Sequence, residues 1–74
     1  MPADLHPLVV ALVARRRQLG WSQMATAHKV GVDPARISHW EAGSRQPQLA
    51  NVTRWAEVLG CRVGLIPLEE TDDR

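Results

Sequence analysis

The sequence predicts an all-α domain of four short helices, followed by one short β-strand. Apolar residues recur at steps of three and four positions in the first twenty residues and again between residues 49 and 59. Glycines at 20, 31, 43 and 60 divide the chain into helix-sized pieces, because glycine readily takes the left-handed conformation that ends a helix. Residues 61–68 read CRVGLIPL, which is β-branched and apolar with an internal glycine. This segment is too short and interrupted for a helix and favours a strand.

The first helix is expected over residues 5–19. Pro7 lies near its first turn, where proline is tolerated, and Gly20 ends it. Arg15, Arg16 and Arg17 occupy the last turns, where positive charge complements the helix dipole. The apolar stripe that would face a core consists of Leu5, Leu8, Val9, Leu12, Val13 and Leu19.

Residues 22–47 predict two short helices joined by a sharp turn. Ser22 is a good N-cap for a helix that starts at Gln23, and Gly31 stops that helix after Val30. The second helix is therefore about two turns long.

A third helix follows the turn. Val32 is expected to point inward, Asp33 to cap the helix, and Pro34 to take its first position, where a missing amide hydrogen costs nothing. The helix should run to about Glu41. Gly43 then ends it, and the loop of residues 44–47 follows.

The side chains on the solvent face of this third helix are short or able to form hydrogen bonds. Ile37 and Trp40 lie three positions apart, so they share the buried face. The residues left toward solvent are Ala35, Arg36, Ser38 and His39. Arg45, in the following loop, should lie beside the same surface.

The fourth helix is expected from about Leu49 to Leu59, with Gly60 as its cap. Its inward stripe would consist of Leu49, Val52, Trp55, Ala56 and Leu59. Trp21, Trp40 and Trp55 could in principle stack on bases, but their positions relative to the apolar stripes indicate core residues. The acidic end, residues 69–74, has no apolar side chain and is expected to be disordered.

The length and composition of the chain indicate one small domain. A chain of 74 residues is near the lower size for a single core, so oligomerisation is a plausible source of further stability. Cys61 has no partner for an internal disulfide, and the chain shows neither an export leader nor eighteen consecutive apolar residues. These features predict a cytoplasmic protein with no membrane segment. Residues 1–68 carry eight Arg and Lys against four Asp and Glu, which leaves +4 and suits, without requiring, contact with phosphates.

Signals for catalysis and metal binding are missing. His6, His28, His39 and Cys61 are the strongest candidate ligands for a transition metal, and none stands in a paired-ligand spacing. The sequence has no glycine-rich phosphate loop and no paired carboxylates within an apolar stripe. We therefore expect no enzymatic activity, no cofactor and no metal.

The ordered set of features resembles the Cro/cI-type, or XRE-family, helix-turn-helix, the lambda-repressor-like domain of phage repressors and bacterial regulators. The resemblance covers residues 12–60 and rests on Arg16, Leu19, Ser22, Gln23, Ala27, Gly31, Val32, Ile37, Ser38, Trp40, Glu41, Gly43, Pro47, Leu59 and Gly60. It implies an ion pair between Arg16 and Glu41. Thr26 departs from the leucine usual in the family, so we expect Met24 or Trp21 to fill the space beneath the second helix.

The resemblance implies a sequence-specific DNA-binding regulator. The third helix would lie in the major groove and read bases with Ala35, Arg36, Ser38 and His39. Ser22, Gln23 and Arg45 would contact phosphates. Pro34 and Ala35 stand where relatives often use hydrogen-bonding side chains, which leaves more of the discrimination to Arg36 and His39.

The chain divides, on this interpretation, into a DNA-binding domain at residues 1–60, a dimerisation strand at 61–68 and an acidic tail at 69–74. A lone apolar strand exposes both its amides and its side chains, so pairing with an identical strand would hide both. The expected homodimer contacts are Arg62, Val63, Leu65 and Ile66. The alternative is that the segment folds back on its own helices.

Three functions remain open from the sequence. The leading one is a repressor of phage or prophage type that binds double-stranded DNA. The second is an antitoxin that represses its own operon and also binds a toxin protein, which a neighbouring toxin gene would indicate. The third, from another class, is an adaptor that uses the same fold to bind protein. The polar face of the third helix favours DNA over this adaptor, because a protein target would favour an apolar face.

Overall fold

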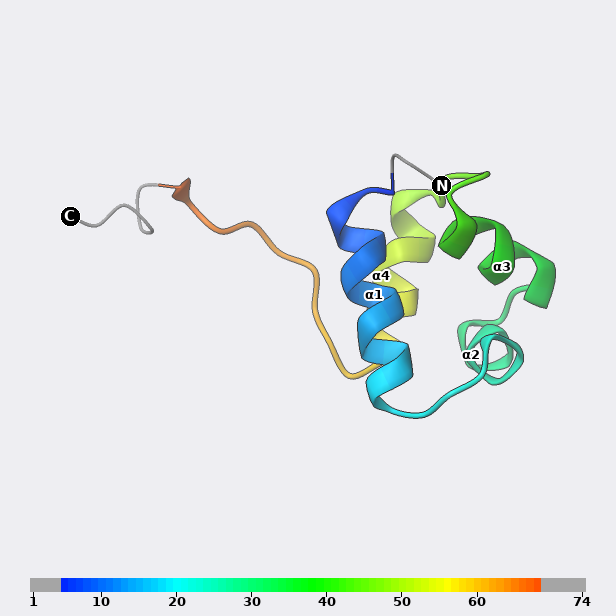
Figure 1. Ribbon diagram of the computed structural model, residues 1–74. Coiled ribbons are helices and arrows are strands. Elements are labelled where there is room, and N and C mark those ends of the chain that lie inside the picture. The colour runs from blue at the N-terminus through cyan, green and yellow to red at the C-terminus, as the bar shows by residue number, and fades with distance from the viewer. Residues whose placement is uncertain (1–4, 69–74) are drawn as a thin grey trace.

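The computed structural model describes residues 5–68, and four helices form the body of that part of the chain. They are α1 (Pro7–Gln18), α2 (Gln23–Val30), α3 (Pro34–Ala42) and α4 (Leu49–Val58). α2 packs against both α3 and α4, and α1 packs against α3 (Figure 1). The predicted all-α class is confirmed. None of the helices in this part of the chain is long and apolar enough to cross a membrane.

Short polar side chains and glycines set the ends of α2 and α3. Ser22 Oγ accepts a hydrogen bond from the amide of Ala25 at 2.9 Å, and Asp33 Oδ1 accepts one from the amide of Ala35 at 2.8 Å. Gly31 ends α2 with a φ of 89°, a conformation that side chains disfavour. The sharp turn between these two helices therefore lies where the sequence places it.

The first helix is shorter than predicted. α1 begins at Pro7 and not at Leu5, because His6 caps it: His6 Nδ1 accepts a hydrogen bond from the amide of Leu8 at 3.0 Å. α4 ends at Val58, one residue before the predicted Leu59.

The core lies between the four helices and is centred on two tryptophans. The rings of Trp40 and Trp55 are 5.5 Å apart with planes tilted by 36°, an arrangement that aromatic pairs favour. The buried apolar residues are Val9, Leu12, Ala27, Val30, Ile37, Trp40, Val52, Trp55, Ala56 and Leu59. Trp21 is half-buried at the edge of this core.

Two predicted core residues are exposed. Leu49 is 81% exposed because it is the first residue of α4, and a helical side chain points back toward the N-terminus, here beyond the helix. Leu19 is 37% exposed and lies one residue past the end of α1, where the chain turns away through Gly20. The apolar period predicted both positions but could not show that they lie at helix ends.

Thr26 takes the place of a core leucine without leaving a polar group unsatisfied. Its side chain is fully buried, and its hydroxyl donates to the carbonyl oxygen of Ser22 at 2.8 Å. Met24 does not fill the space beneath α2, since it is 68% exposed. Trp21 does pack against the core, and the Lys29 ammonium lies 4.8 Å from the centre of its ring.

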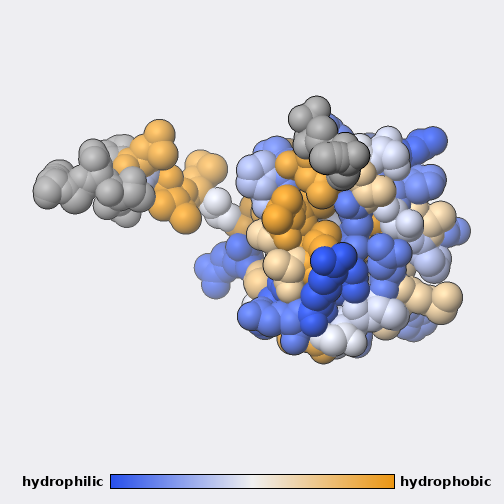
Figure 2. All heavy atoms as spheres, viewed as in Figure 1, coloured by the Kyte–Doolittle hydropathy of each residue, from blue (hydrophilic) through white to orange (hydrophobic). Residues whose placement is uncertain are grey.

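The predicted C-terminal strand is wrong for the isolated chain. Residues 61–67 contain no regular secondary structure and run away from the four helices (Figure 1). A strand requires a neighbouring strand to accept and donate its backbone hydrogen bonds, and residues 5–68 supply none. The apolar side chains of this C-terminal segment stay exposed (Figure 2). The expected acidic tail, residues 69–74, lies outside the described residues.

Candidate nucleic-acid interface

The solvent face of α3 presents two side chains that can hydrogen-bond to a target. Arg36 lies in the first turn and His39 lies three positions later, so both project from the same side of the helix. Both are exposed, and neither side chain makes a hydrogen bond or ion pair within residues 5–68. Ala35 and Ser38 are exposed beside them.

The loop after α3 is held against the helix through one carbonyl oxygen. The oxygen of His39 accepts from the Ser44 amide at 3.1 Å, from Ser44 Oγ at 3.3 Å and from the Arg45 amide at 3.4 Å. Gly43 makes this reversal possible with a φ of 82°. The Arg45 side chain is therefore placed next to α3, and it too has no acceptor among the described residues.

A hollow of about 720 Å³ opens between α3, this loop and the start of α4. It is lined by Asp33, Ala35, Arg36, His39, Trp40, Arg45, Gln46, Pro47, Gln48 and Asn51. Four of the predicted DNA-contacting residues, Ala35, Arg36, His39 and Arg45, meet here. Ser38, Ser22 and Gln23 do not line the hollow.

Three amide side chains in the hollow were missed by the sequence analysis. Gln46 and Gln48 are exposed and Asn51 is half-buried. Gln48 is the N-cap of α4, yet its side chain makes no capping hydrogen bond, so its amide is available to a ligand. The signal in the sequence was the clustering of Gln and Asn around the start of the fourth helix.

The two helix starts differ in their capacity to bind an anion. At α3, Asp33 already accepts from the Ala35 amide, brings a negative charge, and is followed by Pro34, which has no amide hydrogen. At α2, Ser22 accepts from Ala25, while the first two amides, of Gln23 and Met24, have no acceptor within the helix. Of these two helix starts, the α2 start is the one that offers free backbone donors at the positive end of the helix dipole without a nearby negative charge.

Arg16 and Glu41 form a nearly buried ion pair between α1 and α3. Arg16 Nε lies 2.6 Å from Glu41 Oε2 and Arg16 Nη2 lies 2.9 Å from Oε1, with side chains 10% and 6% exposed. Arg16 Nη1 also donates to the carbonyl oxygen of Trp21 at 2.6 Å. This fork joins the end of α1, the backbone two residues before α2 and the end of α3.

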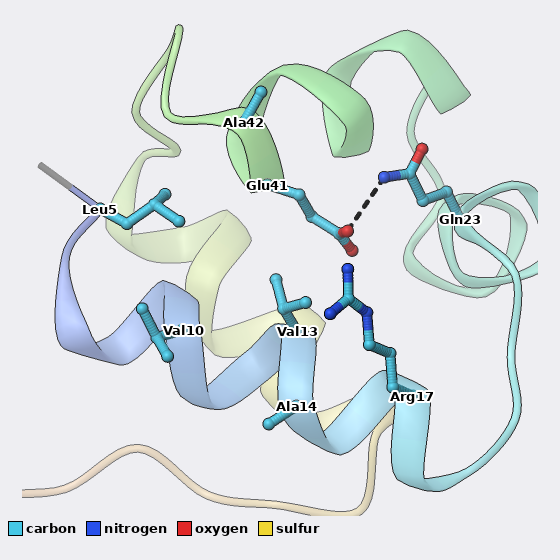
Figure 3. A pocket seen from close by; sticks show the side chains of 8 residues that line it. All are labelled: Leu5, Val10, Val13, Ala14, Arg17, Gln23, Glu41 and Ala42. Atoms are coloured by element: carbon cyan, nitrogen blue, oxygen red, sulfur yellow. Dashed lines mark hydrogen bonds between the residues drawn. The ribbon is translucent and has the colours of Figure 1, made fainter. Parts of the chain in front are cut away.

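Gln23 belongs to the same network. Its Nε2 donates to Glu41 Oε1 at 2.9 Å, as Figure 3 shows, beside an open pocket of about 430 Å³. The carboxylate of Glu41 thus receives hydrogen bonds from α1 and from the first residue of α2. Gln23 is half-buried, which leaves its backbone amide and the rest of its side-chain amide for any contact with DNA.

A sequence model of the helix-turn-helix family matches residues 12–66. The match covers more than half of the chain and includes α2, the turn and α3. The chain belongs to this family. It is an XRE-type helix-turn-helix protein of the Cro/cI kind, a family of DNA-binding transcription regulators and not of enzymes. No curated protein and no solved structure matches the chain.

Two further arginines of this helix-turn-helix protein support helix ends. Arg54 Nε donates to the carbonyl oxygen of Val30 at 2.6 Å, and Arg15 Nε donates to that of Leu59 at 3.0 Å. Each guanidinium satisfies a carbonyl at the C-terminal end of a helix, where positive charge is favoured. These two arginines therefore hold α2 and α4 in place, whereas the arginines that line the hollow have no acceptor among residues 5–68.

Proposed function

We propose that this regulator is a repressor that binds an inverted-repeat operator as a homodimer and reads it with α3 in the major groove. The observation that carries the proposal is the hollow beside α3, where Arg36, His39 and Arg45 project without a protein partner. Exposed cationic and hydrogen-bonding groups of this kind match the base edges and phosphates of DNA.

Base choice is assigned to the residues on the exposed face of α3. The Arg36 guanidinium can donate two hydrogen bonds to O6 and N7 of a guanine. His39 can donate to or accept from a base edge, and Ala35 can contact a thymine methyl group. Ser38 stands on the flank of the helix outside the hollow, so its share in reading is smaller.

Phosphate contacts are assigned to two places on either side of α3. The first is the start of α2, where Ser22 and Gln23 present amides to the DNA backbone. The second is the rim of the hollow, where Arg45 supplies charge and Gln48 an uncommitted amide. Contacts on both sides of the reading helix would fix its depth and angle in the groove.

Dimerisation is assigned to the C-terminal segment of residues 61–68. Val63, Leu65 and Ile66 are 38%, 99% and 77% exposed, which is costly for an isolated domain. We propose that Arg62 to Pro67 pairs antiparallel with the same segment of a second copy. A two-fold dimer of this kind binds two half-sites of opposite orientation, whose centres lie about 34 Å apart on one face of the duplex.

The polar face of α3 supports DNA over a protein target as its partner, because protein-binding surfaces concentrate apolar and aromatic groups at their centre. Repressors of phage type and antitoxins would share the DNA-reading geometry proposed here. The phage-type repressor is the simpler proposal, since it needs no second protein. Survival of cells that co-express the protein with a toxin encoded beside it would favour the antitoxin.

Selection of bound duplexes from a random DNA pool tests the proposal. We expect enrichment of an inverted repeat with half-site centres about one helical turn apart, roughly 10 to 10.5 base pairs. Recovery of a single unrepeated half-site would contradict the dimeric arrangement but leave the reading helix in place. Recovery of no motif from the pool would contradict sequence-specific DNA binding altogether.

A further inference from the structure

α1 has an apolar face that its own core does not use. Residues 7–14, PLVVALVA, are apolar all around the helix, a pattern typical of a helix covered on more than one side. Val9 and Leu12 face the core, whereas Val10 is 50% exposed and Ala11 and Ala14 are exposed. Val10 and Ala14 are four positions apart and both line the open pocket beside Glu41 (Figure 3), so they form one continuous exposed stripe along this flank of the helix.

One edge of this outer stripe lies near the start of the C-terminal segment, because Ala11 is four positions before Arg15 on α1. Arg15 binds the carbonyl oxygen of Leu59, so the segment leaves the helical body next to the last turns of α1. In the space-filling view, apolar atoms gather over the N-terminal half of α1, on the face beside which the apolar segment extends (Figure 2). The apolar surface over α1 in this view and the exposed apolar segment are therefore neighbours.

We propose that the outer stripe of α1, consisting of Val10, Ala11 and Ala14, is the surface on which the paired C-terminal segments of the homodimer pack. This inference rests on the dimer proposed above and adds the helix surface against which the paired segments pack. A ribbon of only two strands is marginally stable in water and requires a helix or further strands against one face. The outer stripe of α1 provides such a helix in each copy.

Backbone hydrogen bonding selects a second copy over the segment's own chain as the partner. The backbone of residues 62–67 makes no hydrogen bond within the described part of the chain. If the segment folded alone onto its own α1, the helix could cover its side chains but could not pair its amides, because the helix uses its backbone groups internally. Pairing with the same segment of a second copy satisfies the amides, and packing on α1 covers the side chains.

Substitutions on α1 test the inference without altering the segment. Val10→Asp and Ala14→Glu should raise the dimer dissociation constant by roughly tenfold or more, because each would bury an unpaired carboxylate. Met24→Asp is the matched control, since Met24 is an even more exposed apolar residue, on α2, and it should dimerise like the wild type. Sedimentation over a concentration series measures the constant, and circular dichroism verifies that each variant is folded.

The outcomes separate this inference from the dimer on which it rests. If the chain truncated after Gly60 is monomeric while Val10→Asp dimerises like the wild type, the segments pair but do not pack on α1. If the truncated chain is still a dimer, the segment is not the dimer interface and both proposals fall. In a Cys61→Ser background, Val10→Cys with Leu65→Cys should oxidise to a disulfide between α1 and the segment, within one chain or between two according to which copy's α1 the segment covers. Failure of the two cysteines to cross-link in the dimer would overturn the inference.

Discussion

Five arginines of this protein form two groups that differ in what their side chains bind. Arg15, Arg16 and Arg54 each join one helix to the end of another, and each guanidinium binds a protein carbonyl or carboxylate. Arg36 and Arg45 lie at the hollow beside α3 and bind no protein acceptor within residues 5–68. Arginine therefore stabilises the helical body in the first group, whereas in the second group it stays available for a ligand.

This difference shows why net charge is a poor guide to a DNA-binding surface. Three of the seven arginines in residues 5–68 have their charge committed to internal acceptors. A phosphate can compete for such a guanidinium only at the cost of a buried carboxylate or an unsatisfied helix end. The comparison predicts that arginines of the first group affect the stability of the protein, whereas those of the second affect its affinity for DNA.

The largest expected effect comes from breaking the ion pair of the scaffold region. Glu41→Ala should lower the free energy of unfolding by about 3 to 5 kcal/mol, because it leaves the Arg16 guanidinium buried without its carboxylate. Gln23 would lose its acceptor as well. Urea denaturation followed by tryptophan fluorescence measures this change.

A double substitution sharpens the same prediction. Arg16→Met combined with Glu41→Met removes both charges and should cost less than Glu41→Ala alone, because no unpaired charge is left behind. An unfolding midpoint of Glu41→Ala equal to that of the wild type would show that the pair does not fix the end of α3.

The second largest effect is expected in the recognition of DNA bases by Arg36, which lines the hollow. Arg36→Ala should leave the unfolding midpoint unchanged and cost about 1 to 3 kcal/mol in binding at a particular base pair of each half-site. Arg17→Ala is the matched control, since Arg17 also has no hydrogen bond or ion pair in the described chain but lies outside the hollow. Titrations against the operator and its single-base variants measure the difference. Equal loss for every sequence would mean that Arg36 contacts the backbone and reads no base.

Much of the fold was predictable because its local signals agree with its packing. The caps Ser22 and Asp33 and the glycines after α2 and α3 fix the turn through contacts only a few residues apart in sequence. Ile37 and Trp40 are buried as their spacing predicts. The ion pair joins two residues, Arg16 and Glu41, that are 25 positions apart in sequence. It came from the resemblance to the family, since no local rule could supply it.

The remaining features depend on tertiary arrangement that periodicity does not encode. The helical periodicity of apolar residues groups Leu49 with the buried residues of α4, although Leu49 is the first residue of the helix and is exposed. The roles of Arg15 and Arg54 require the ends of helices that are distant in sequence to lie next to them. The hollow is formed jointly by α3, the loop and α4, so Gln46, Gln48 and Asn51 joined the candidate site only when the fold was known.

A smaller effect on stability is expected at Arg54, the exposed member of the three arginines that bind internal acceptors. Arg54→Met keeps most of the aliphatic side chain but removes the hydrogen bond to Val30, so the free energy of unfolding should fall by about 1 kcal/mol. Arg17→Met, which removes a guanidinium with no acceptor, should change stability by less than about 0.5 kcal/mol. Thermal unfolding of both variants gives the comparison. If the two variants unfold alike, the capping arginine does not contribute to stability and the proposed division between the groups weakens.

The smallest expected effect belongs to Arg45, which lies in the loop held by the His39 carbonyl oxygen. A guanidinium at this rim can reach a phosphate but carries no sequence information there, so Arg45→Ala should weaken binding to the operator and to its base variants equally. Each phosphate contact releases about 0.9 of a counterion, and the homodimer loses one contact in each half-site, so the slope of log affinity against log salt should become shallower by roughly twice that amount. Binding measured across a salt series on matched and substituted operators separates this result from that of Arg36→Ala, which should change base preference. An unchanged slope, with affinity lost for one base variant only, would move Arg45 from the phosphate contacts to the base-reading residues of the same hollow.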